Sequence, residues 1–537
     1  MLSYRKLAMR VLGRPLHTEG IDSPRPASQR AAAFILTAAM LTTLAAPAFA
    51  DIWHIENGDI TISAGESGNN VTQNNNTTYG GTNTIITNQN KDTASSHTVT
   101  IEAKDKDDKV EVTLKDVNID TSSRNKAAVS VTGEGDTNIK LDGDNALKSD
   151  IYRSGIYGSG SGSLTISGGE NDSLTAQGGS GANGISSSGS LTISGGTVTA
   201  NGDDGGRGIS SNGGVTISGG STVTANGGSG TISGGDGICS SGGVTISGGS
   251  TVTANGGNGG SLVGGDGIRS GGGLTVSDGT VTAKGGNGDS KDGYGGDGIR
   301  SGGVVTISGN TVNAAGGYGG KVGGYGICSF DRVAISGGMV EAAGGNGSTG
   351  GGSGIYSSVI DLSGSLELTA KAGSPNGKAL SQKGSELVLD TIKDKLGPGA
   401  KVTATDADGK VIDQVSTPRP VEPEESSSSS DGGSAAPSAP VSPLPGLTVT
   451  DKDGQRISYT STQSGNTLTV CVGRLTASFR ISLAALRQLR AEGIETIAFQ
   501  TVLCSTTLSV DELLAMGGEN AEAVLTHRFT DSSLTVG

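Results

Sequence analysis

Short hydrophobic pairs recur along the central part of the chain and are separated by glycine-rich turns. Residues 264–288 read GGDGIRSGGGLTVSDGTVTAKGGNG, and their aliphatic positions are Ile268, Leu274, Val276 and Val281. Within each pair the hydrophobic residues alternate with polar ones, which is typical of β-strands that bury one face. The segment therefore predicts three short strands joined by corners of Gly, Asp and Ser.

The same three-strand unit repeats along the chain. From Ile185 onward, the middle of the LTIS-like element lies eight residues after the isoleucine of the Gly-Ile element, and the TVTA-like valine follows five or six residues later. Most of the variation in length therefore falls between TVTA and the next Gly-Ile. Disordered linkers have no reason to keep such spacing, whereas a solenoid does. The Gly-Ile isoleucines are spaced by 29, 24, 29, 30, 31, 28 and 28 residues and are Ile156, Ile185, Ile209, Ile238, Ile268, Ile299, Ile327 and Ile355.

This periodicity predicts an all-β fold, a right-handed parallel β-helix with three short strands per coil of 24–31 residues. Coils stacked at about 4.8 Å would pair strand to strand and align Ile, Val and Leu in one buried column. Alternating strands in 98–149 predict earlier coils, and those in 359–415 predict the last coils and a cap.

The ends of the chain differ from the repeats. Basic residues precede an apolar run that ends in Ala48-Phe49-Ala50, a pattern typical of an export signal cleaved near Ala50. We therefore expect a secreted or cell-surface bacterial protein with no transmembrane segment in the mature chain. The predicted organisation is a signal peptide (1–50), a parallel β-helix with capping segments at both ends (51–415), a Pro/Ser-rich linker (416–445) and a small α+β domain (446–537).

Composition narrows the range of partners. The formal net charge of −14 disfavours nucleic acid and anionic membranes as partners. The four cysteines form no C-x-x-C pair, which argues against a zinc ribbon, and a disulfide between Cys471 and Cys504 stays open.

The clearest candidate chemistry is the position two residues before the Gly-Ile isoleucine, which holds Asp236, Asp266 and Asp297 in three successive coils. In-register stacking would bring these carboxylates to about 5 Å from one another, where like charges repel. A bound Ca²⁺ would relieve that repulsion, and so would Arg269 and Arg300, which follow the isoleucines. The alternative is that Asp-Gly only forms a corner.

Aromatic side chains near the coil edges are candidates for stacking on sugar rings, and the alternative is that they fill space at a loop edge. No histidine falls on the repeats, which excludes a Ser-His nucleophile pair there. A lyase would instead need Arg or Lys beside carboxylates, so Arg269, Lys284 and Arg300 with Asp266 and Asp297 keep that alternative open. The candidate aromatic residues are Tyr294, Tyr318, Tyr325 and Tyr356.

The segment VEVTLKDVNIDTSSRNKAAVSVTGEGDTNIKLDGDNALKS (110–149), followed by GSLTISG, GGTVTANGDDGGRGI and GGDGI, resembles a family of bacterial carbohydrate-binding β-helix domains. That family is related to a cell-surface polysaccharide-binding protein of Clostridium thermocellum, and the resemblance covers roughly 98–370. It implies a pectin-lyase-like β-helix that binds acidic plant polysaccharide with calcium. This chain departs from the family in its longer Gly-rich loops and in the scarcity of acidic residues around several coils.

Taken together, these features predict a non-catalytic carbohydrate-binding protein that recognises an acidic plant or mucosal polysaccharide on one face of the β-helix, with Ca²⁺ as a candidate cofactor. Cell-wall or host-surface components are the expected partners. A structural adhesin that binds a protein partner is the first alternative, and a polysaccharide lyase is the second.

Overall fold

The computed structural model describes residues 51–309, 311–418, 447–450, 456–457, 459–464, 466–472, 476–501, 505–516, 522–528 and 531–536. The chain divides into two compact units, Met1–Pro423 and Glu424–Gly537, and each is described by itself. The predicted signal peptide, residues 419–445 of the predicted linker and Cys504 lie outside the described residues. Among the described helices, none has the length and apolar character needed to cross a membrane.

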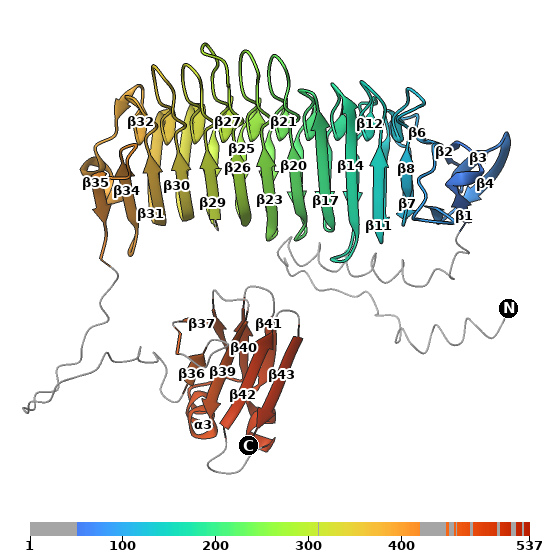
Figure 1. Ribbon diagram of the computed structural model, residues 1–537. Helices are drawn as coiled ribbons and strands as arrows, with labels where there is room; N and C mark the ends of the chain where they lie inside the picture. The colour runs from blue at the N-terminus through green and yellow to red at the C-terminus, as the bar shows by residue number, and fades with distance from the viewer. Residues whose placement is uncertain are drawn as a thin grey trace, which may run out of the picture. The chain divides into compact units, whose positions relative to one another are not determined.

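The first unit is a parallel β-solenoid of about 13 turns, so the predicted β-helix is confirmed (Figure 1). Three parallel ladders of strands run along it, and each coil adds one strand to each ladder. Strands β30 (Ile327–Ala343) and β31 (Ile355–Lys371) pass through all three ladders without a break.

The first ladder contains the Gly-Ile elements. Before β30 its strands are β2 (Ile60–Gly65), β6 (Val99–Ala103), β9 (Val129–Gly133), β12 (Ile156–Gly158), β15 (Ile185–Ser187), β18 (Ile209–Ser211), β21 (Ile238–Ser240), β24 (Ile268–Ser270) and β27 (Ile299–Ser301), and β32 (Leu380–Gln382) follows β31.

The second ladder contains the LTIS-like elements. Before β30 its strands are β1 (Asp51–His54), β5 (Thr84–Thr87), β7 (Lys109–Lys115), β10 (Asp136–Asp142), β13 (Leu164–Ser167), β16 (Leu191–Ser194), β19 (Val215–Ser218), β22 (Val244–Ile246), β25 (Leu274–Val276) and β28 (Val305–Ile307).

The third ladder contains the TVTA-like elements. Before β30 its strands are β8 (Asn118–Asp120), β11 (Asp144–Lys148), β14 (Ser173–Ser180), β17 (Thr197–Asp203), β20 (Thr222–Asn226), β23 (Ser250–Asn255), β26 (Gly279–Lys284) and β29 (Thr311–Ala315), and β34 (Lys401–Thr405) follows β31.

The repeat positions coincide with the register of the ladders. Ile268 pairs with Ile238 on one side and Ile299 on the other, as the spacing of the Gly-Ile elements predicts. Leu274, Val276 and Val281 are, like Ile268, completely buried. The aliphatic residues of successive coils therefore form one continuous core inside the three ladders, as expected of units too small to bury a face alone.

Antiparallel strands close the solenoid at both ends. At the N-terminal end, the 3-10 helix η1 (Ile55–Asn57) precedes β2, which pairs with β3 (Gly68–Gln73), and β3 pairs with β4 (Asn76–Gly81). At the C-terminal end β32 pairs with β33 (Ser385–Glu386), a 3-10 helix η2 (Leu389–Lys395) follows, and β34 pairs with β35 (Val411–Ser416). Such caps prevent other chains from adding strands to the open ladder ends.

The second unit is a small α+β domain with its own core. One sheet has the order β36-β39-β42-β43 and the other has the order β37-β38-β40-β41. Ser482 caps the helix α3 by accepting a hydrogen bond from the Ala485 amide, as its position before the helix predicts. The elements are β36 (Leu447–Thr450), β37 (Thr460–Ser464), β38 (Thr467–Cys471), β39 (Thr476–Ser482), α3 (Leu483–Ala491), β40 (Thr496–Gln500), β41 (Ser505–Ser509), α4 (Val510–Met516), β42 (Glu522–Arg528) and β43 (Asp531–Val536).

Candidate functional site

The three aspartates that the repeat aligns lie together at the entry to the first ladder. Asp236, Asp266 and Asp297 each end the long loop that precedes β21, β24 and β27, and all three are buried. We call these three residues the aspartate ladder. Their alignment in successive coils was a sequence prediction, and the structure brings them together.

Each carboxylate of the aspartate ladder binds the backbone of the next coil. Oδ1 of Asp236 accepts a hydrogen bond from the Asp266 amide (2.9 Å), and Oδ1 of Asp266 accepts one from the Asp297 amide (2.7 Å). Asp297 continues the series by accepting from the Tyr325 amide (2.7 Å). One carboxylate oxygen per coil is therefore occupied in joining coil to coil.

The second carboxylate oxygens face arginines. Arg300 Nη1 lies 3.2 Å from Asp297 Oδ2, and Arg207 Nε, from the preceding coil, lies 3.3 Å from Asp236 Oδ2. Arg269 Nη1 is further from Asp266 Oδ2, at 3.9 Å, which is an ion pair without a hydrogen bond. The Arg269 side chain is 52% exposed. Its guanidinium therefore keeps donors free for an external anion.

Burial favours the protonated form of two members of the aspartate ladder, Asp266 and Asp297. It raises the pKa of Asp266 above the usual aspartate range, and the neighbouring charges of Asp297 and Asp236 raise it further. Burial also raises the pKa of Asp297, although the Tyr325 amide and Arg300 oppose that shift. Protonation of Asp266 leaves Arg269 with less compensating negative charge, which favours an anionic ligand at Arg269.

Glycine-rich loops form the wall opposite the arginines. These loops span 227–237, 256–267, 285–298 and 316–326, the connections whose length varies most. Parallel backbone β-bridges pair Val263 with Tyr294, and Tyr294 with Val322. One residue from each loop is therefore aligned along the solenoid axis. Wall and arginines enclose a groove of about 790 Å³. The groove also crosses the coils of Asn183 and Arg207, and we refer to it below as the groove.

Backbone hydrogen bonds hold successive loops at very short separation. The Gly257 amide donates to the Gly235 carbonyl, the Gly265 amide to Gly257, and the Gly286 amide to Gly265, each at 2.8 Å. A Cβ on Gly265 would overlap the Gly235 carbonyl oxygen. Glycine is thus required at this position by the close approach of the backbones. The sequence showed glycine enrichment here but not this hydrogen-bond pattern.

Aromatic side chains gather at the end of the groove nearest the C-terminal coils. Tyr325 and Tyr356 stack with ring centroids 4.9 Å apart, and Arg300 lies 5.2 Å from the ring centroid of Phe330. Tyr325 and Tyr294 line the groove, whereas Tyr318 and Tyr356 are not among its lining residues. Tyr318 projects from a loop into solvent and is 47% exposed.

Arg207, which lines the groove, and Phe330, which contacts Arg300, were not among the predicted site residues. Arg207 belongs to the same row as the aspartates, but its pairing with Asp236 in the following coil needs the three-dimensional stack. Phe330 follows β30's Gly-Ile element, outside the repeated pattern, so no periodic signal marks it. The register also places Cys239 and Cys328 in the row of Arg269 and Arg300, and burial raises the pKa of these thiols to about 11 and about 12.

The arrangement tests whether calcium fits the aspartate ladder. Calcium takes six to eight oxygen ligands. Here the Oδ1 atoms accept hydrogen bonds from backbone amides and the Oδ2 atoms face guanidinium groups. The carboxylate oxygens are therefore better placed to bind arginine side chains than to coordinate a metal ion. Within the described ranges, no group of three or more acidic, cysteine or histidine side chains is arranged to hold a metal ion. Calcium binding stays an untested prediction.

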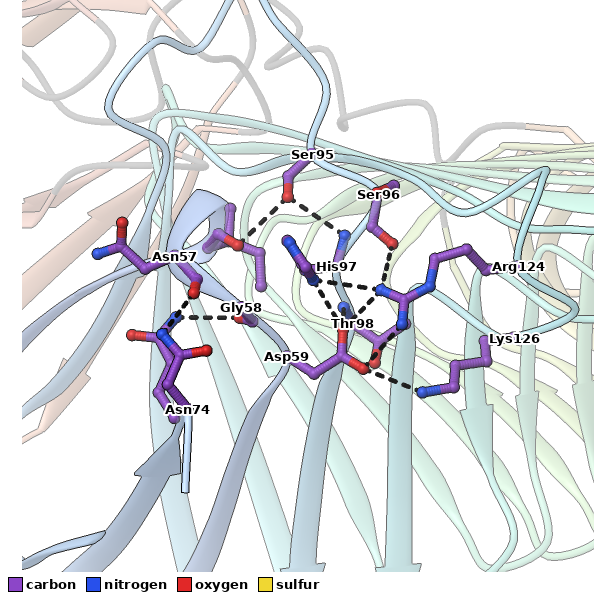
Figure 2. Close-up of polar contacts among 12 residues, drawn as sticks. Asn57, Gly58, Asp59, Asn74, Ser95, Ser96, His97, Thr98, Arg124 and Lys126 are labelled. Carbon is purple, nitrogen blue, oxygen red and sulfur yellow. Dashed lines mark hydrogen bonds and ion pairs between the residues drawn. The ribbon is translucent and has the colours of Figure 1, made fainter. Parts of the chain in front are cut away.

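A second polar cluster lies at the N-terminal end of the solenoid, in the coil that begins with β2 (Figure 2). Arg124 donates to both carboxylate oxygens of Asp59, at 2.8 and 3.1 Å, and Lys126 Nζ lies 3.0 Å away. His97 Nδ1 (3.1 Å) and the Thr98 amide (3.0 Å) complete the contacts of Asp59. We call this the Asp59 cluster, and all its cations are occupied by one carboxylate.

No protein-family model, curated protein or solved structure matches this chain. The resemblance to carbohydrate-binding β-helix domains therefore stays a prediction from the quoted segments.

Proposed function

We propose that the chain is an exported, non-catalytic polysaccharide-binding protein, and that an acidic polysaccharide lies in the groove along the axis of the solenoid. The observation that carries the proposal is the set of three partly exposed arginines that line the groove, Arg207, Arg269 and Arg300, beside a wall of apolar and aromatic side chains. Each coil adds about 4.8 Å along this axis, which is comparable to the length of one sugar unit in an extended chain.

The chemistry of the two sides suits an acidic sugar. A guanidinium binds a carboxylate through paired N–H donors, and Arg269 has the most exposed guanidinium of the three. Tyr294, on the opposite wall, is 43% exposed and offers an aromatic surface for the apolar face of a sugar ring. Binding energy would then come from both sides of the same sugar unit.

The lyase alternative is less well supported. A lyase needs a base that removes a proton from the sugar, held within hydrogen-bonding distance of it. Among the described groove-lining residues there is no histidine or lysine, and a guanidinium is a poor base in proteins, which weakens Arg269 and Arg300 as candidates. Arg300 is in addition paired with Asp297. The adhesin alternative, in which a protein partner occupies the groove or another surface, is separated from the proposal by the choice of probe.

The proposal is tested by binding of the full chain to a glycan array and to polygalacturonate, once with calcium and once with chelator. The double variant Arg269→Gln/Arg300→Gln should weaken binding at least roughly tenfold, since a hydrogen bond to a charged group contributes about 1.5–3 kcal/mol. The matched control is Arg332→Gln, because Arg332 is exposed on β30 and does not line the groove.

Three results would overturn the proposal. They are the absence of any acidic-glycan signal in both buffers, equal binding by the double variant and the wild type, and the appearance of unsaturated sugar products. The last result would establish the lyase alternative, and a signal that depends on calcium would locate a cation in the complex.

A further inference from the structure

A second surface of the solenoid is built from threonine. In the third ladder, the outward side chains form two ranks of five threonines each, aligned from coil to coil. Figure 1 shows the strands β17, β20, β23, β26 and β29 side by side on one face. We call this surface the threonine face. Its outer rank is Thr197, Thr222, Thr251, Thr280 and Thr311, and its inner rank is Thr175, Thr199, Thr224, Thr253 and Thr282.

The threonine face is free of charge in a chain whose net charge is −14. The outward residues of β17, β20 and β23 are Thr and Asn, apart from Asp203 at the last position of β17, and Lys284 is a second charge at the end of β26. The flanking coils differ, because β11 carries Asp144 and Lys148, and β30 carries Glu341 opposite Asn313. The two threonine ranks are thus uncharged, and charged residues lie only in the flanking coils and at the ends of β17 and β26.

The sheet does not use these threonine hydroxyls. Cross-strand threonines often stabilise a sheet through side-chain hydrogen bonds. Among the described residues, however, no hydroxyl of the two ranks bonds to another protein group. The neighbouring asparagines behave differently, since Asn226 donates to Asn201 and Asn255 donates to Asn226, both at 2.8 Å. The hydroxyls of the threonine face are therefore available to an external ligand.

The array is periodic in two directions. Along the solenoid axis, neighbouring threonines of a rank are separated by the strand spacing of about 4.8 Å. Along each strand, the two ranks are two residues apart, roughly 6.6 Å. These spacings are close to the repeats of oxygen atoms on a prism face of hexagonal ice. A flat surface of regularly spaced hydroxyl and methyl groups matches a solid lattice better than it matches a folded protein.

We infer that the threonine face binds ice, with threonine hydroxyls occupying lattice positions and the adjacent methyl groups ordering the water between them. The main competing lattice is crystalline polysaccharide. Flat sugar surfaces are bound through aromatic stacking, and the outward positions of β17, β20, β23, β26 and β29 contain no aromatic residue. This activity is independent of the groove, which lies along the first ladder.

The test is inhibition of ice recrystallisation by the full chain, compared with Thr251→Lys and Thr245→Lys. Thr251 is the central, exposed member of the outer rank on β23. Thr245 is also exposed, on β22, where the second ladder carries a single row of aligned threonines rather than two ranks. A lysine at Thr251 interrupts the flat array with a long hydrated cation. We expect inhibition by the wild type and by Thr245→Lys, and loss of most of it in Thr251→Lys.

Absence of inhibition by the wild type, or equal loss in both variants when circular dichroism shows both to be folded, would overturn the inference. Retention on crystalline cellulose or chitin that Thr251→Lys abolishes, without an effect on ice, would assign the threonine face to a sugar lattice instead. A concentration-dependent dimer that Thr251→Lys disrupts, again without an effect on ice, would assign it to a second copy of the chain.

Discussion

Asp59, at the N-terminal end of the solenoid, and Asp266, in the groove, are both aspartates whose contacts join different coils, yet their pKa values shift in opposite directions. Contacts with Arg124, Lys126, Thr98 and His97 outweigh burial and lower the pKa of Asp59. Burial, reinforced by the two other carboxylates of the aspartate ladder, raises the pKa of Asp266. In the Asp59 cluster, the carboxylate and the basic side chains satisfy one another. In the groove, by contrast, the arginines stay partly available for a ligand.

The contacts that join successive coils also differ between the two regions. In the early coils, exposed ion pairs such as Lys115–Asp142 (2.7 Å) and Lys148–Asp120 (3.0 Å) join neighbouring strands. In the groove coils, glycine loops pack backbone against backbone. In these coils, exposed side chains line the groove or form the threonine face instead of joining coil to coil.

The largest expected effect comes from disturbing the glycine loops. Gly265→Ala forces a Cβ against the Gly235 carbonyl, so we expect a loss of about 3 kcal/mol in the groove coils, the upper end for overpacking. Gly350→Ala is the control, because a Cβ there meets only ordinary contacts with Val322. Thermal unfolding measures both variants, and equal melting temperatures would show that the loops relax without cost.

Replacing one aspartate by asparagine should change stability in opposite directions in the Asp59 cluster and in the groove. Asp59→Asn loses ionic contacts with Arg124 and Lys126 and should destabilise the first coils by about 1 kcal/mol, a value kept low because Asp59 is partly exposed. Asp266→Asn keeps an acceptor for the Asp297 amide and relieves repulsion, so we expect a gain of about 1 kcal/mol at pH 8. Chemical denaturation at that pH gives the sign, and a loss at Asp266 would contradict the comparison.

The pH dependence of stability should have opposite signs in the Asp59 cluster and in the groove. Because the folded pKa of Asp59 is lowered, its contribution is present above the unfolded value near 4 and is lost as the pH falls further. Because the folded pKa of Asp266 is raised, the folded groove binds a proton more tightly, and stability falls as the pH rises from about 4 toward its folded pKa. Hydrogen exchange of β6 and β24 amides, corrected for intrinsic rates, resolves the two regions. Parallel pH profiles would refute the difference.

The smallest effect on stability is expected for Arg269, the groove arginine with the weakest contact to its aspartate. Arg269→Gln should change the free energy of unfolding by no more than about 0.5 kcal/mol, since Arg269 forms no hydrogen bond with Asp266. Arg124→Gln should cost more, because Arg124 binds both oxygens of Asp59 and the Ser96 carbonyl. If the two variants were equally destabilised, Arg269 would be a structural residue and a weaker candidate for ligand binding.

The sequence predicted what depends on periodicity. Constant spacing from Gly-Ile to TVTA was enough to place Ile268, Leu274, Val276 and Val281 in the core, and to align Asp236, Asp266 and Asp297. Alignment follows from register, because parallel strands repeat their side chains at the strand spacing.

The remainder depends on contacts that periodicity does not encode. The counter-ion of Asp236 is Arg207 of the preceding coil, which requires knowledge of which rotamers meet across coils. Tyr318 was a plausible stacking residue, but its side chain is 47% exposed and does not line the groove, which the repeat spacing alone does not indicate. Phe330 lies outside the repeat and gave no signal.

The central claim, that the groove binds an acidic polysaccharide, is tested most directly by a hydrogen-exchange footprint of the full chain with polygalacturonate oligomers. We predict slower exchange in the loops 256–267 and 285–298 that form the groove wall, and no change around Asp59 or in the second-ladder strands β22 and β25. Protection that is absent from these loops, or equal throughout the solenoid, would contradict the account.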